Sequence, residues 1–363
     1  MPKGQGAVKY QMPIHLSPGW KLALVAMGTF VATLVGEGLF RLVPFERFKY
    51  EARYGHFSGN VVNHFLEYDP VLTFRNRRGA SFPDARMAIN SLGLRGPEVA
   101  LEKRPGTRRV LCLGDSCTFG GGHPYSEFLQ AILDRRFGGG RFEVLNGGVI
   151  GYTSLHGLEW YQRELARLHP DIVTIYFGWN DMWRTKDTAI RDWFARRLEK
   201  REPIFRSYFW EALTRTASFL KNRFEPGDVP LHIPPDRYRQ VLEQFAELGK
   251  RDDFTPVYVT APSGFDDDKT PAWLVDKGFV ARGDSALALR RRYNQVVLDV
   301  AREHRLPVAD CAAAFEQSGA RSLFERPDED PIHPNDRGYE RIAETLAETI
   351  ATGHAAIRGP AVD

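Results

Sequence analysis

Cysteine is scarce in this chain, with three residues among 363. Three cysteines cannot form the disulfide framework of a small secreted scaffold, and Cys112, inside an apolar run, is expected to be a core residue. A strong charge imbalance is also missing, because the formal net charge of +3 is too small to indicate nucleic-acid binding. Hydrophobic content of 43% and charged content of 26% are typical of a folded globular protein, and the length suits one large domain or two modest ones.

Long apolar runs are rare as well, and one segment departs from the rest. Residues 22–40 carry a single charge, Glu37, and as a helix would reach about 28 Å, close to the thickness of a bilayer core. No Ala-x-Ala site follows, and the chain stays apolar beyond Phe40. We therefore expect an uncleaved single-pass anchor, with a cleaved signal peptide or a buried helix as alternatives. Basic residues lie on both sides of the run, so charge alone leaves its orientation open.

The remaining chain divides by composition. Residues 1–21 are expected to form an N-terminal tail, residues 41–107 a small lobe, residues 108–353 the main domain and residues 354–363 a second tail. Within the lobe, short apolar stretches broken by prolines predict strands and turns rather than a long helix, at residues 71–74, 87–89 and 92–94.

The main domain alternates strand-like and helix-like patterns. Five short β-branched or aromatic runs predict buried strands, at residues 110–113, 142–145, 172–177, 255–260 and 306–309. Amphipathic helical stripes lie between or after them, near residues 128–133, 155–168, 241–248, 289–300 and 339–350. This alternation predicts an α/β protein, a three-layer α/β/α (flavodoxin-like) fold with a five-stranded parallel sheet, preceded by a transmembrane helix.

One connection, residues 182–235, is longer than a plain crossover requires. It contains two apolar helical stripes, and from residue 184 to residue 223 it has 11 basic and 5 acidic residues. The expectation is a basic helical insertion, either packed on the core with a solvated basic face or capping the site near anionic lipid headgroups.

Two motifs supply the groups of a nucleophilic triad. Ser116, in Gly114-Asp115-Ser116, directly follows the first strand, and Asp330 and His333 lie three residues apart in one proline-flanked loop. A serine hydroxyl needs a base to take its proton as it attacks, and a neutral imidazole held by a carboxylate does this near pH 7. We therefore predict Ser116 as the nucleophile, His333 as the base and Asp330 as its partner.

Two further motifs offer hydrogen-bond donors for an oxyanion. Gly151 follows the second strand and Asn180, in Gly178-Trp179-Asn180-Asp181, follows the third. The Ser116 and Gly151 N–H groups and the Asn180 amide are the predicted oxyanion hole. Ligands in parallel α/β sheets bind beyond the carboxyl ends of the strands, which is where these residues fall.

These four blocks, in this order, resemble those of the SGNH (GDSL-type) hydrolase family. Its Gly-Asp-Ser, its second-block glycine, its Gly-x-Asn-Asp and its Asp-x-x-His-Pro-Asn correspond to residues 114–116, 151, 178–181 and 330–335. Residues 90–96 also look like the membrane-anchored bacterial members. The resemblance implies a serine esterase with no metal and no cofactor, acting on a small-molecule, lipid or carbohydrate ester. It also implies an extracytoplasmic catalytic domain in the cell envelope. The compact members lack the long insertion.

Several alternatives stay open at this stage. The same triad can transfer an acyl group to an envelope polysaccharide instead of water, and the fold can serve as a non-catalytic binding module. Ser116 can be a simple helix cap, and Cys117 an alternative nucleophile. A metal site is a further option, formed by Asp328, Asp330, His333 and Asp336. Residues 120–122 are three glycines after a strand, a weak signal for a phosphate loop.

Overall fold

The structure is a computed structural model that describes residues 17–42, 65–69, 71–82, 86–185, 209, 229–266 and 269–358. The chain forms two compact units. One contains Met1–Phe45 and Pro203–Lys221, and the other contains Glu46–Glu202 and Asn222–Asp363. The second unit holds the sheet and every predicted site residue.

A five-stranded parallel sheet forms the centre of this second unit. Its strands are β5 (Arg108–Gly114), β6 (Phe142–Gly148), β7 (Ile172–Tyr176), β8 (Thr255–Val259) and β9 (Val308–Ala309), in the order β6-β5-β7-β8-β9. All five residues of β7 are buried, as expected for a strand covered on both faces. The predicted five-stranded parallel sheet is confirmed, and its order is that of flavodoxin-like folds.

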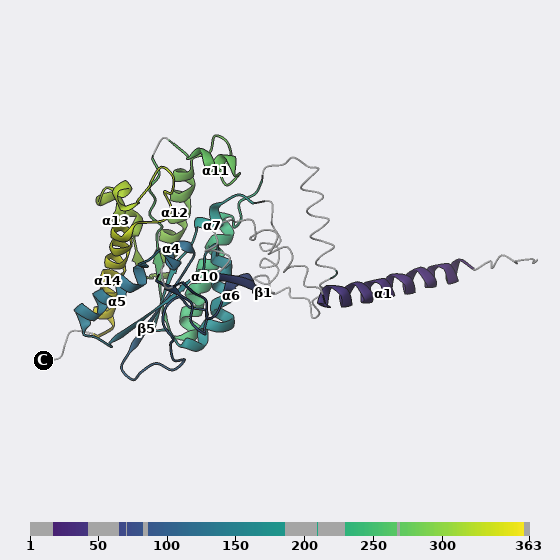
Figure 1. Cartoon of the computed structure of the whole chain (residues 1–363), viewed down its shortest axis with the longest axis horizontal. Coiled ribbons are helices and arrows are strands. Elements are labelled where there is room, and N and C mark those ends of the chain that lie inside the picture. The colour runs from purple at the N-terminus through teal and green to yellow at the C-terminus, as the bar shows by residue number, and fades with distance from the viewer. Residues whose placement is uncertain are drawn as a thin grey trace, which may run out of the picture. The chain divides into compact units, whose positions relative to one another are not determined.

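Helices cover both faces of the sheet and complete the predicted three layers (Figure 1). One face carries α5 (Tyr125–Phe137), α13 (Cys311–Gln317) and α14 (Asp336–Arg358), and the other carries α6 (Ser154–Trp160), α10 (Pro235–Asp252) and α12 (Ala286–His304). The helices present apolar stripes at helical spacing; in α10 the buried residues include Tyr238, Val241, Leu242 and Phe245. After α6 the chain continues as a π-helical turn, Tyr161–Leu165, and a 3-10 turn, Ala166–Leu168.

Four shorter helical elements complete the described part of this unit. The two nearest the predicted site are α4 (Ser116–Phe119), after β5, and α7 (Trp179–Met182), after β7. Two others are α11 (Ala272–Asp276) and the 3-10 turn Ala320–Leu323. Thus the predicted nucleophile and the predicted Asn180 both sit in single-turn helices at the carboxyl edge of the sheet.

The segment before the sheet forms two small antiparallel hairpins. β1 (Leu66–Asp69) pairs with β2 (Thr73–Asn76), and β3 (Ser81–Phe82) pairs with β4 (Met87–Ala88). Residues 92–94 are not a strand. The Asn90 side chain accepts hydrogen bonds from the N–H groups of Leu92 at 2.9 Å and Leu94 at 3.0 Å, and this local pairing makes a turn.

The N-terminal apolar run forms a helix, α1 (Pro18–Leu42), of 25 residues. It is the one helix of the described residues long and apolar enough to cross a membrane, with a mean hydropathy of 1.8 in a window that is 6% buried. A signal sequence has the same features, so the helix alone does not choose between anchor and signal. The two predicted helical stripes of the basic insertion fall almost wholly outside the described residues.

Candidate active site

Ser116 lies where β5 turns into α4. A Cβ on Gly114 would fall 1.9 Å from Thr118 Oγ1, so the turn requires glycine at the end of the strand. Asp115 caps the helix, since its Oδ1 accepts a hydrogen bond from the Cys117 N–H at 2.9 Å. Asp115 and Cys117 are fully buried, whereas Ser116 between them is partly exposed. The turn therefore presents the serine and hides its neighbours.

His333 and Asp330 reach Ser116 from the loop that precedes α14. Ser116 Oγ lies 2.8 Å from His333 Nε2, and His333 Nδ1 lies 2.8 Å from Asp330 Oδ2. Asp330 Oδ1 also accepts hydrogen bonds from the backbone N–H groups of Ile332 at 3.2 Å and His333 at 3.1 Å. The loop thus fixes the carboxylate through its own backbone, and the three side chains line up in the order that nucleophilic catalysis needs.

The electrostatics of this pair suit a base. Burial lowers the pKa of His333, but the hydrogen bond and charge of Asp330 outweigh burial and leave the pKa raised. Burial in turn raises the pKa of Asp330, and its hydrogen bond to His333 outweighs that effect, so the carboxyl stays ionised. With a proton on Nδ1 donated to Asp330, Nε2 is free to accept the proton of Ser116.

Gly151 and Asn180 lie at the same edge of the sheet as Ser116. Gly151 has φ of +85°, and a Cβ there would be 3.3 Å from the Phe74 ring, so the position favours glycine in both conformation and space. The Asn180 Nδ2 group donates to the Tyr152 carbonyl at 3.0 Å, which leaves its second N–H available. Both residues are partly exposed; Asn180 lies between buried neighbours, and Gly151 precedes the buried Tyr152. A partly exposed donor beside a buried scaffold can meet a bound substrate.

Asp181 ties the second and third motifs together. Its carboxylate accepts hydrogen bonds from the Ser154 N–H at 3.1 Å, from the Ser154 hydroxyl and from the Gly178 N–H at 3.1 Å. Burial raises the pKa of Asp181 to about 7. Sequence reasoning treated Asp181 only as part of a motif, whereas the structure makes it the link between the loop that carries Gly151 and the helix that carries Asn180.

Comparison with known proteins gives the family. The family model described as "GDSL-like Lipase/Acylhydrolase family" matches residues 112–341. The chain belongs to this family. It is therefore an ester-hydrolysing enzyme, and the resemblance drawn from the four sequence blocks is confirmed. No curated protein matches the chain.

Solved structures similar to this acylhydrolase include three enzymes. An α/β hydrolase from the metagenome of Lake Arreo has 19% identity, with 67% of this chain and 95% of that chain covered and a TM-score of 0.45. An acetylxylan esterase from Geobacillus stearothermophilus has 17% identity, 69% and 96% coverage and a TM-score of 0.44. A lipase/acylhydrolase from Enterococcus faecalis has 18% identity, 68% and 97% coverage and a TM-score of 0.44.

The other candidate residues of the acylhydrolase have different surroundings. Cys117 is fully buried, and burial raises its pKa well above the usual value, so it is a poor nucleophile. Asp328 pairs with Arg321 at 2.6 Å, and Asp336 pairs with His123 at 3.2 Å. Among the described residues, no three His, Cys, Asp or Glu side chains gather as metal ligands would.

The geometry of the glycine loop at residues 120–122 does not suit phosphate binding. Its carbonyl oxygens face the guanidinium of Arg95, which donates to Gly120, Gly121 and Gly122. A phosphate loop instead points backbone N–H groups at its ligand. Sequence reasoning missed both Arg95 and His232, whose Nδ1 lies 3.1 Å from the Asn180 carbonyl, because neither belongs to a catalytic motif.

Proposed function

We propose that this acylhydrolase is a serine esterase with Ser116 as nucleophile, His333 as general base and Asp330 as the residue that orients His333. The observation that carries the proposal is the unbroken hydrogen-bonded chain from Ser116 Oγ through the His333 ring to Asp330, with 2.8 Å at both its links. A lone helix-capping serine has no need of such a partner.

The proposed reaction has two halves. Ser116 Oγ attacks the ester carbonyl carbon while its proton moves to His333 Nε2, and the oxyanion is held by the Ser116 and Gly151 N–H groups and the Asn180 amide. The C–O bond then breaks, and His333 returns the proton to the departing alcohol. Water attacks the acyl-enzyme by the same route, releases the acid and restores Ser116. No step needs a metal ion or a cofactor.

The proposed substrate is an acyl ester of a carbohydrate or a lipid, and the proposed location is a membrane, with α1 as a single-pass anchor and the catalytic unit on the extracytoplasmic side. The alternative proposal is transfer of the acyl group to an envelope polysaccharide, since a sugar hydroxyl can replace water in the second half-reaction.

The test is turnover of p-nitrophenyl esters of increasing acyl length by the full-length protein in mild detergent. Ser116→Ala should lower kcat by at least about a thousandfold, because the covalent route is lost. The matched control is Ser322→Ala, which removes an exposed serine hydroxyl and should leave kcat unchanged within about twofold.

The outcomes separate the candidates. Serine-dependent release of p-nitrophenol supports the esterase, and the preferred chain length then indicates acetylated carbohydrate or lipid. A single burst of p-nitrophenol with turnover only after a sugar acceptor is added favours the transferase. Turnover that survives Ser116→Ala contradicts the proposed nucleophile, and a folded protein with no burst favours a binding module.

A further inference from the structure

Arg95 is a buried cation beneath the nucleophile helix. Its side chain is 5% exposed, and its guanidinium donates to the carbonyl oxygens of Phe119, Gly120, Gly121 and Gly122, the Gly120 bond being 2.7 Å long. The Phe119 ring lies 5.0 Å from the guanidinium carbon. The first of these carbonyls belongs to the last residue of α4 and the other three follow it, so Arg95 caps the C-terminal end of the helix that begins at Ser116.

A buried cation loses its hydration, which costs free energy that an uncharged side chain in the same place would not lose. Burial lowers the pKa of Arg95 to about 10. Within the described chain no carboxylate forms an ion pair with it, so its hydrogen bonds go to backbone carbonyls. Four carbonyls from four consecutive residues can face one group only if the loop takes a single conformation, which the planar, five-donor guanidinium can impose and an ammonium cannot. The guanidinium therefore fixes the loop that leaves the nucleophile helix.

The segment that contains Arg95, residues 65–97, also contacts the loop that carries Gly151, the second proposed oxyanion donor. Asn76 donates from one amide to the carbonyls of Gly93 and Gly148, both at 3.0 Å. The Phe74 ring lies 3.3 Å from where a Cβ of Gly151 would be, and the Phe74 carbonyl accepts a hydrogen bond from the Tyr152 hydroxyl at 2.9 Å. One segment thus contacts both the loop that leaves α4 and the end of β6.

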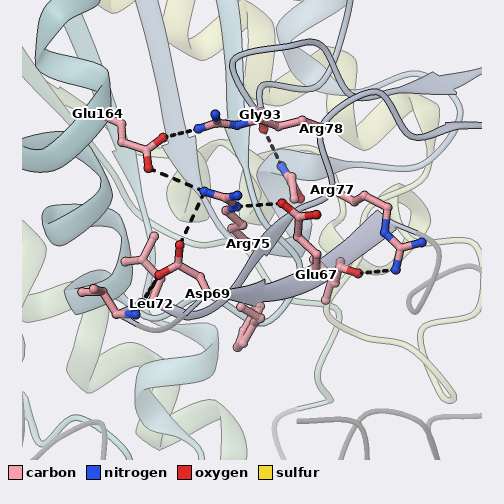
Figure 2. A network of polar contacts seen from close by, with 12 residues as sticks. Glu67, Asp69, Leu72, Arg75, Arg77, Arg78, Gly93 and Glu164 are labelled. Atoms are coloured by element: carbon pink, nitrogen blue, oxygen red, sulfur yellow. Dashed lines mark hydrogen bonds and ion pairs between the residues drawn. The ribbon is translucent and has the colours of Figure 1, made fainter. Parts of the chain in front are cut away.

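An ion-pair network holds this segment on the helical layer. Arg78 binds Glu164 at 2.7 Å, and Arg75 lies between Glu67 at 2.8 Å and Glu164 at 3.9 Å. Figure 2 shows Arg75 and Arg78 pointing to the same Glu164 carboxylate, with Asp69 below Arg75. Since these ion pairs are partly exposed, each adds little to the free energy of unfolding by itself. An arginine of this network is therefore a suitable control for Arg95.

We propose that Arg95 is a positioning residue for the nucleophile: by binding the carbonyls of residues 119–122 it holds α4, and with it the Ser116 hydroxyl, in line with His333. The proposal rests on the proposed role of Ser116. It adds one supporting residue, Arg95, from ahead of the region that the family model matches, which begins at residue 112.

The experiment compares full-length Arg95→Lys, Arg95→Ala and Arg78→Ala with the unmodified chain. Because a misplaced reacting group costs rate rather than affinity, kcat should fall by about a hundredfold in Arg95→Ala and about tenfold in Arg95→Lys, with KM within about twofold. Arg78→Ala removes a cation from the same segment and should keep kcat within about twofold. Millimolar guanidinium chloride, but not sodium chloride, should partly restore Arg95→Ala by filling the vacated site.

Two further readouts separate positioning from loss of fold. A melting temperature well above the assay temperature shows that a variant is folded. Hydrogen exchange of the peptide covering residues 116–122 should rise in Arg95→Lys but not in Arg78→Ala. The proposal is overturned by a folded Arg95→Lys with unchanged kcat and exchange, or by a loss of rate in Arg78→Ala equal to that in Arg95→Ala. If the unmodified chain shows no Ser116-dependent turnover, the proposed function fails, and exchange alone still decides whether Arg95 holds the loop.

Discussion

Ser116 and Asn180, two residues of the candidate site, are partly exposed while their neighbours in sequence are buried. Ser116 lies between Asp115 and Cys117, and Asn180 between Trp179 and Asp181, all four of these flanking residues being at most 1% exposed. The buried neighbours leave little freedom to the backbone, so the reactive side chains are held without being covered. A site built this way is already ordered before substrate arrives.

The His333–Asp330 pair determines the expected pH dependence. His333 acts as a base only when neutral, and its pKa lies above the ordinary value, so kcat/KM should rise with pH and reach half its maximum above about pH 6.5. In Asp330→Asn the charge that raises the pKa is gone while burial still lowers it, so the midpoint should move to lower pH. The plateau should fall by about a thousandfold or more, because the ring loses its orienting partner.

The matched control for this prediction is Asp328→Asn, two residues away. Asp328 is 89% exposed at its side chain and pairs with Arg321 rather than with His333. The pH–rate profile of both variants, measured with one p-nitrophenyl ester, is the required measurement. An Asp330→Asn midpoint equal to that of the unmodified enzyme would show that the carboxylate does not tune His333.

Among the secondary-structure elements near the site, β6 approaches the backbone of α4 closely. A Cβ on Gly148 would lie 2.1 Å from the Phe119 nitrogen, in the backbone of the helix that begins at Ser116. Gly148→Ala should therefore push β6 and α4 apart and lower the free energy of unfolding by about 1–3 kcal/mol or more. Urea unfolding measures this loss.

Gly139→Ala is the control, because nothing lies within 4 Å of the Cβ that it would add and the backbone there does not require glycine. It should change the midpoint of unfolding little. Equal midpoints for Gly148→Ala and Gly139→Ala would mean that the strand and the helix adapt freely, and the contact would then not fix the nucleophile helix.

How far the elements were predictable depends on how local their causes are. β5 and β7 are apolar runs buried on both faces, so each was predicted close to its true ends. Residues 92–94 were predicted only as part of a region of short strands and turns, and the Asn90 side chain decides that they form a turn. Local composition identifies the sheet but not a backbone shaped by one side chain.

On the scale of the whole molecule, the proposed catalytic residues were predicted from their motifs, but the groups that contact them were not. Ser116 and His333 can be predicted from the sequence because the proposed chemistry needs those residue types in short, ordered blocks. Arg95 binds carbonyls that lie 24 to 27 residues later in the chain, and Asp181 binds Ser154 27 residues earlier. One sequence does not show such long-range pairs: residues 90–96 resemble the membrane-anchored family members, but their sequence does not indicate which carbonyls Arg95 binds.

The N-terminal helix leads to the last prediction, that the whole chain is held in a membrane by α1. Large apolar side chains of this helix are exposed along its length, including Leu22 at 72%, Phe30 at 63% and Leu34 at 55%. Transfer of such a surface from water into lipid is favourable, and each arginine at the centre of a spanning helix costs about 2.5–3.5 kcal/mol. Full-length protein should therefore sediment with membranes and resist extraction by alkaline carbonate, whereas Val31→Arg combined with Leu34→Arg should move it to the soluble fraction.

Leu101→Arg, at an exposed leucine of the other unit, is the control and should leave the protein in the membrane. Intact mass of the membrane-bound protein separates the two roles of the helix: a mass that includes residues 18–42 supports a retained anchor, and a soluble protein lacking them would identify a cleaved signal sequence.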